Sequence, residues 1–148
     1  RLILADALTY AGEGDPDLII SMATLTGAAR IAVGLDLAPF YAGSEMHAQM
    51  LMSASKTALD PLWQMPFWDP YDALIEPKLA DLDNAPKVGF AGSITAALFL
   101  RRFVPDPERY VHFDIYGWNP TKVPGRPHGG TIQGPRAVLR ALEDIFSQ

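Results

Sequence analysis

Hydrophobic and polar residues follow two different periods along this chain, one typical of helices and one typical of strands. The helical period predicts five helices, at residues 1–11, 28–33, 45–58, 93–103 and 135–148. Short apolar runs or strict alternation predict three strands, at residues 18–22, 37–42 and 110–116. Because strands and helices interleave and no repeat is visible, we expect an α/β fold.

The periodicity also predicts which residues face inward. For the first helix the predicted inner face is Leu4, Ala7, Leu8 and Ala11, and for the third it is Met46, Met50, Leu51 and Ala54. Ser93 precedes an apolar run and is expected to be an N-cap. Two segments rich in proline, 59–71 with its aromatic residues and 119–130 with its glycines, are expected to be ordered loops.

An apolar strand that ends in a small, hydroxyl-bearing loop is the most informative local feature. The run Leu18–Met22 is followed by Thr24, Leu25, Thr26 and Gly27. In open α/β sheets, ligands bind at the carboxyl ends of the strands. Glycine permits close approach of a ligand to the backbone, and the two threonines supply hydroxyl groups. The sequence therefore predicts a ligand-binding loop here.

The amino-acid composition indicates which classes of binding partner the protein is expected to lack. Hydrophobic residues make up 49% and charged residues 20% of the chain, as in globular proteins. The net charge is −5 with no cluster of Lys or Arg, so we expect no nucleic-acid partner. No apolar run approaches the ~20 residues of a membrane-spanning helix, so we expect no membrane partner. The absence of cysteine excludes disulfides and fits a reducing, cytoplasmic compartment.

The residues with catalytic potential leave alternatives open. Asp81 and Asp83 form the closest carboxylate pair, either metal ligands or members of a polar turn. His112 and Asp114 share one strand face with Tyr116, either as an acid–base pair or as a hydrogen-bonded polar stripe. The aromatic loop forms a sugar platform or packs on the core. Neither a serine nucleophile elbow nor a phosphate-binding glycine loop is present, so these residues alone name no reaction.

Five segments resemble the leucyl (cytosol) aminopeptidase family of two-metal exopeptidases, in family order and spacing. They are Arg1-Leu-Ile-Leu-Ala-Asp-Ala-Leu8, Ala23-Thr-Leu-Thr-Gly-Ala28, Ala80-Asp-Leu-Asp-Asn84, Thr95-Ala-Ala-Leu-Phe-Leu100 and His112-Phe-Asp-Ile115. The resemblance implies a three-layer α/β/α domain with a central mixed sheet. Residues 1–148 would be the C-terminal portion of the catalytic domain.

The resemblance assigns functions to individual residues. It implies that Arg1 is catalytic and holds a bicarbonate that serves as general base. The metal ligands, for two manganese or zinc ions, would lie upstream of Arg1, so we expect none within the chain. Leu25 would offer its backbone carbonyl to the attacking water or the substrate amide. The first side chain of the peptide would contact a pocket formed by Thr24, Thr26, Gly27, Tyr116 and Asn119.

The resemblance also implies an activity and an assembly. The expected reaction is metal-assisted release of N-terminal amino acids from peptide substrates, by a homo-hexamer. Tyr116 stands where family members often carry alanine, so we expect a reshaped pocket rather than a simple leucine preference. Two alternatives remain: a catalytically incomplete fragment that acts only in packing and oligomer contacts, and an unrelated α/β binding domain.

Overall fold

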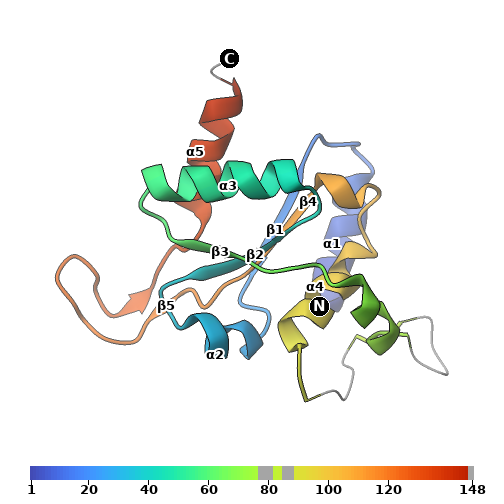
Figure 1. The fold of residues 1–148 in the computed structure, drawn as a ribbon, viewed down its shortest axis with the longest axis horizontal. Coiled ribbons are helices and arrows are strands. Elements are labelled where there is room, and N and C mark those ends of the chain that lie inside the picture. Colours follow the sequence, from blue (N-terminus) through green and yellow to red (C-terminus); the bar gives the residue numbers. More distant parts are fainter. Residues whose placement is uncertain (77–81, 85–88, 147–148) are drawn as a thin grey trace.

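The computed structural model describes residues 1–76, 82–84 and 89–146 (Figure 1). Within these segments the helices are α1 (Leu2–Gly12), α2 (Ala28–Val33), α3 (Glu45–Thr57), α4 (Gly92–Arg101) and α5 (Pro135–Phe146), with 3-10 turns η1 (Asp69–Leu74) and η2 (Pro107–Arg109). The strands are β1 (Ile19–Ala23), β2 (Ala38–Ala42), β3 (Leu62–Gln64), β4 (Tyr110–Asp114), β5 (Trp118–Asn119) and β6 (Gly129–Gly130). All five predicted helices and all three predicted strands are therefore confirmed.

The central sheet is mixed, with strand order β1-β4-β2-β3. β4 runs parallel to β1 and antiparallel to β2, and β3 adds to β2 in parallel. Every residue of β4 is buried, because this strand has a neighbour on each side. Successive side chains of β4 point to opposite faces of the sheet, so one strand contributes to two different layers.

Helices α3 and α5 cover one face of the sheet, which we call the α3/α5 face (Figure 1). Its core contains the rings of Phe40 and Phe113, whose centroids lie 5.6 Å apart. The predicted inner face of α3 is wrong at Met46, which is 67% exposed, whereas Ala48 is fully buried. The contact stripe includes Ala48 because its small side chain lets the helix approach the sheet and α5 closely.

Helices α1 and α4 pack against the opposite face, which we call the α1/α4 face. Leu8 of α1 is buried as predicted, but Ala7 and Ala11 are exposed and Ala5 takes the inward position. Ala5 and Leu8 are three residues apart and therefore share one side of the helix. With helices on both faces of a mixed sheet, the fold is a three-layer α/β/α arrangement.

The two predicted loops contain strands too short for a periodic pattern. Segment 59–71 includes β3, and segment 119–130 runs from β5 to β6, which pair as an antiparallel hairpin. In the first loop the ring of Phe67 stacks on Tyr110 and lies tilted against Tyr41, while Trp63 and Trp68 are each 52% exposed. The aromatic loop thus packs on the core through Phe67 and Tyr71. No helix in the described segments is long and apolar enough to cross a membrane.

Candidate functional site

The loop Thr24–Gly27 lies at the carboxyl ends of two neighbouring parallel strands. It follows β1, and the register pairs Ala23, the last residue of β1, with Asp114, the last residue of β4. The backbone N–H of Ile115 donates to the carbonyl of Ala23 over 3.0 Å, which continues the pairing by one residue. The segments that leave β1 and β4 therefore start side by side, at the sheet edge where α/β proteins bind ligands.

Asp114 fixes the loop to the sheet. Its carboxylate is only 3% exposed and accepts the backbone N–H of Thr26 at 2.8 Å on one oxygen. The hydroxyl of Thr26 donates to the other oxygen. Two bonds from one residue to one carboxylate determine both the position and the orientation of the loop, and charge-assisted bonds of this kind are strong.

Ser93 supplies a third hydrogen bond to the same carboxylate. Its hydroxyl donates to Asp114 over 2.7 Å, and it accepts the hydroxyl of Tyr41 at 2.6 Å. The prediction that Ser93 is an N-cap is wrong, because the residue before the helix is Ala91, with φ of 57°. The first turn of α4 instead directs the buried Ser93 hydroxyl toward the end of β4. Burial raises the pKa of Tyr41 well above its ordinary value, so its hydroxyl remains a donor.

A second polar cluster lies beside this one on the α1/α4 face. His112 is fully buried, and its Nδ1 lies 2.8 Å from the hydroxyl oxygen of Ser21, which is also 2.8 Å from that of Tyr110. Burial lowers the pKa of His112 to about 4, and the charge of Asp114 opposes this shift only in part. A neutral, enclosed imidazole favours the polar stripe over the acid–base pair.

Arg1 faces the same carboxylate from another direction. Its guanidinium donates to the main-chain carbonyl of Asn84 and interacts electrostatically with Asp114 and Asp83. Partial burial lowers the pKa of Arg1, and the two carboxylates oppose that shift. A positive charge at this position compensates the buried negative charge of Asp114. Asp81, the other member of the predicted carboxylate pair, lies outside the described residues.

Three of the residues expected to line the pocket lie close together. A Cβ atom built on Gly117 would lie 3.3 Å from the methyl group of Thr24, so Thr24 packs against the chain just after Tyr116. The guanidinium of Arg30 lies 4.6 Å from the centre of the Tyr116 ring. The same guanidinium borders Gly27, where an added Cβ would lie 2.9 Å from its Nη2 atom. Leu25 packs partly on the core of the α1/α4 face.

Asn119 lies in the β5–β6 hairpin. Its side-chain amide donates to the carbonyls of Arg126 and Pro127, over 3.0 and 2.8 Å. These two bonds hold the returning strand of the hairpin. The amide is therefore engaged in hairpin structure, and the contribution of Asn119 to a substrate pocket stays a prediction.

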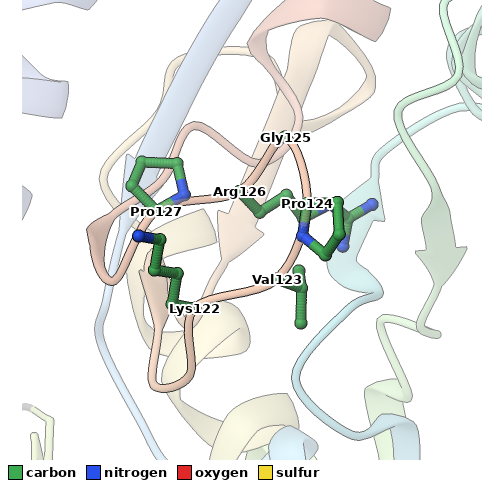
Figure 2. A pocket seen from close by; sticks show the side chains of 6 residues that line it. All are labelled: Lys122, Val123, Pro124, Gly125, Arg126 and Pro127. Atoms are coloured by element: carbon green, nitrogen blue, oxygen red, sulfur yellow. The ribbon is translucent and has the colours of Figure 1, made fainter.

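Two cavities lie around the β5–β6 hairpin, and Asp114 lines neither of them. One, of about 560 Å³, is lined by the consecutive residues 122–127, and Figure 2 shows that they form a single excursion of the chain. The other, of about 700 Å³, lies between the hairpin and the start of α5 and includes Asn119, Gln133 and Arg136 in its lining. A hollow made by one loop brings no separate elements together, whereas Asp114 joins residues from α4, β4 and the loop after β1.

The described side chains do not provide a set of metal ligands. Among the described residues, no group of three or more His, Cys, Asp or Glu side chains is placed to hold a metal ion. Asp114 uses its oxygens for hydrogen bonds, and His112 is enclosed. These residues therefore do not by themselves form a metal centre.

Sequence reasoning found the Thr24–Gly27 loop but missed what holds it. The sequence pairs Asp114 with His112 and predicts a helix cap at Ser93, whereas in the structure both hold the loop through the Asp114 carboxylate. Nothing in the local sequence marks Arg30, which the fold brings onto the Tyr116 ring. Contacts between residues 88 positions apart, such as Thr26 with Asp114, leave no local pattern in a single sequence.

Comparison with known proteins gives consistent results. A model of the cytosol aminopeptidase family, catalytic domain, matches residues 1–139. A probable cytosol aminopeptidase of Syntrophotalea carbinolica is 45% identical over 97% of this chain and 29% of the relative. The crystal structure of a cytosol aminopeptidase from Coxiella burnetii superposes with a TM-score of 0.92 at 49% identity, covering 97% of this chain and 32% of that one.

A more distant structure has the same fold. The bottromycin maturation enzyme BotP, in a structure described as a complex with Mn, gives a TM-score of 0.90 at 29% identity and covers 98% of this chain and 33% of its own. The chain thus spans about 29% of the length of the Syntrophotalea carbinolica relative.

Proposed function

Since this chain belongs to the cytosol aminopeptidase family, we propose that the full-length protein hydrolyses the first peptide bond of peptides and releases their N-terminal amino acids. The observation that carries the proposal is the Asp114 carboxylate, which fixes the Thr24–Gly27 loop at the carboxyl ends of β1 and β4. This loop is the segment that the family resemblance assigns to substrate contact.

The proposal includes a metal requirement. Two divalent ions, manganese or zinc, would supply Lewis-acid chemistry, with ligands that the resemblance places upstream of Arg1. The description of BotP as a complex with Mn supports this choice. The described residues of the present chain do not hold such a centre, so the steps assigned below concern only what these residues do.

The described residues bind and orient the peptide. Asp114 holds the N–H and hydroxyl of Thr26, which fixes the adjacent Leu25 carbonyl as an acceptor for the substrate amide. Arg1, beside Asp114 and Asn84, is positioned to hold an anion such as bicarbonate. Thr24, Gly27, Tyr116 and Asn119 form the proposed pocket for the first side chain.

Hydrolysis of leucyl-p-nitroanilide by the full-length protein, with and without added manganese, tests the proposal. We expect turnover that increases with manganese. Thr26→Val removes the hydroxyl that donates to Asp114 while keeping the shape, so we expect kcat/KM to fall about tenfold. Thr57→Val is the matched control, because the Thr57 hydroxyl only closes the last turn of α3. Absence of turnover with alanyl, leucyl, phenylalanyl and glutamyl substrates alike would contradict the proposal.

We further propose a homo-hexamer located in the cytoplasm. On α1 the apolar side chains of Leu2, Ile3 and Tyr10 are 59%, 86% and 76% exposed, which supports a surface that other protein segments cover. The same surface supports the alternative of a role limited to packing and oligomer contacts. Sedimentation of the full-length protein separates the two: assembly with turnover supports the enzyme, and assembly without turnover supports the alternative.

A further inference from the structure

Arg30 lies at the proposed pocket, although the family resemblance assigns it no role there. It lies on α2, three residues after Gly27, and its guanidinium reaches back over that glycine. The same group stacks on the ring of Tyr116 at 4.6 Å from its centre. Gly27 lies in the loop after β1 and Tyr116 in the segment after β4, so Arg30 contacts both segments that leave these neighbouring strands.

The charge of Arg30 has no acidic partner among the described residues. Every other arginine in these segments faces at least one carboxylate: Arg1, Arg101, Arg102, Arg109, Arg126, Arg136 and Arg140. Arg30 instead contacts an aromatic face, which orients the guanidinium plane without using its N–H groups. Its hydrogen-bonding edge therefore stays available to a ligand.

We propose that Arg30, held by Tyr116, makes the pocket selective for peptides whose first residue is aspartate or glutamate. The planar guanidinium binds a carboxylate through two parallel N–H···O bonds, a geometry that a neutral amide does not match. The ring of Tyr116 adds bulk where a long apolar side chain would otherwise extend. This inference rests on the proposed aminopeptidase function, because it names the substrate class of the same site.

Calorimetric titration of the full-length protein with free amino acids tests the inference without requiring turnover. The probes are L-glutamate against L-glutamine and L-aspartate against L-asparagine, pairs that differ mainly in side-chain charge. We expect about tenfold tighter binding of the acid in at least one pair, as for a charge-assisted hydrogen bond. Equal binding in both pairs, or no binding of any probe, would overturn the inference.

Substitutions assign the preference to Arg30. Arg30→Met keeps an extended side chain beside Tyr116 but removes the charge, so the acid-to-amide ratio should fall to about one. Arg30→Lys keeps the charge without the planar fork and should leave an intermediate ratio. Arg140→Met is the matched control, since Arg140 pairs with Glu143 and Asp144 on α5, and its ratio should stay as in the wild type. An unchanged ratio in Arg30→Met overturns the inference.

Turnover separates this inference from the proposed function. Wild-type enzyme should hydrolyse glutamyl- or aspartyl-p-nitroanilide with kcat/KM about tenfold above the matching amide, and Arg30→Met should lose that ratio whereas Arg140→Met should keep it. Turnover of leucyl substrate without any acidic preference overturns the inference and leaves the proposed function standing. Acid-selective binding that depends on Arg30, with no turnover of any substrate, supports the pocket and contradicts the peptidase.

Discussion

The two faces of the central sheet differ in what their side chains do, although they share β4. On the α3/α5 face, Val111 and Phe113 join a core of aliphatic and aromatic side chains. On the α1/α4 face, His112 and Asp114 enter a set of hydrogen bonds that ends at the Thr24–Gly27 loop. Strand alternation thus separates two roles at neighbouring positions: residues that set stability and residues that position the loop.

The difference predicts different responses to mutation. Packing on the α3/α5 face depends on volume, because protein interiors are filled closely and tolerate voids poorly. The network of Tyr41, Ser93, Asp114 and Thr26 depends instead on each donor having its acceptor. A change on the first face should therefore alter unfolding, and a change on the second should alter turnover.

The largest expected effect is the loss of stability in Phe113→Ala. Phe113 is fully buried and stacks on Phe40, so its removal leaves a cavity and should lower the free energy of unfolding by about 3–5 kcal/mol. Urea unfolding of the full-length protein measures this. The kcat/KM of the folded fraction should stay within about threefold of wild type, because Phe113 points away from the loop. Loss of turnover without loss of stability would contradict the division between faces.

The next largest expected effect is a pH dependence of the free energy of unfolding, caused by the buried His112 on the α1/α4 face. The pKa of His112 is lowered to about 4 in the fold, so between about pH 6.5 and pH 4 the unfolded chain binds a proton that the folded chain does not. Stability should therefore be complete above pH 6.5 and fall by up to about 3 kcal/mol on acidification to pH 4.

Glutamine does not titrate, so the variant His112→Gln lacks the contribution of this side chain to the pH dependence. Urea unfolding of the full-length protein at several pH values should show a shallower dependence for the variant than for the wild type, whatever the absolute stability of each. Parallel curves would show that His112 is protonated as easily in the fold as out of it.

A smaller effect tests whether a buried polar group on the α3/α5 face is purely structural. Asp60 is 2% exposed and accepts the backbone N–H groups of Arg136 and Ala137 at 3.1 and 3.2 Å, at the start of α5. Asp60→Ala should cost about 1–2 kcal/mol in thermal unfolding, as for a lost helix cap, with kcat/KM unchanged. Asp36→Ala, which removes only an exposed pair with Arg126, is the control and should cost less than about 0.5 kcal/mol. A fall in kcat/KM with Asp60→Ala would show that residues on the α3/α5 face affect the reaction, and would contradict the division between the two faces.

The smallest effect is expected from Tyr41→Phe. It removes the donor to Ser93 but keeps the ring that packs against Phe67. We expect kcat/KM to fall about two- to fivefold, because Ser93 and Thr26 still bind Asp114, and stability to change by about 1 kcal/mol. Steady-state kinetics of the purified variant measure the first quantity. A fall as large as that of Asp114→Asn would place the reacting group nearer to Tyr41 than to the loop.

The helices and strands of this fold could be predicted because each shows its own period in the sequence. β4, for example, alternates Val111, His112, Phe113 and Asp114, and the structure sends these side chains to alternate faces. The three-residue strand β3 and the β5–β6 hairpin were not predicted, since two or three residues do not establish a period. The predicted inward face of α3 is confirmed at Leu51 and Ala54 but wrong at Met46, because hydrophobicity ranks methionine above His47 and Ala48, the residues that fit there.

For the site, the sequence predicted the loop but not its support. The composition of residues 24–27, which are Thr24, Leu25, Thr26 and Gly27, is enough to predict a loop at the end of a strand. Three contacts of the site depend on which strands are neighbours. They are the bonds of the Asp114 carboxylate to Thr26 and to the Ser93 hydroxyl, and the contact of the Arg30 guanidinium with the Tyr116 ring. A local sequence pattern does not show which distant residues come into contact in the fold, so only the structure identifies these residues.

The measurement that tests the account most directly is the kcat/KM of Asp114→Asn in the full-length protein, compared with that of wild type on the best aminoacyl-p-nitroanilide. Asparagine has nearly the same shape but replaces one acceptor oxygen by a donor, so it cannot accept all three bonds, those from the backbone N–H and the hydroxyl of Thr26 and from the hydroxyl of Ser93. We predict a fall in kcat/KM of about 100-fold, with a folded protein by circular dichroism. A kcat/KM within about twofold of wild type would contradict the claim that Asp114 positions the loop for the reaction.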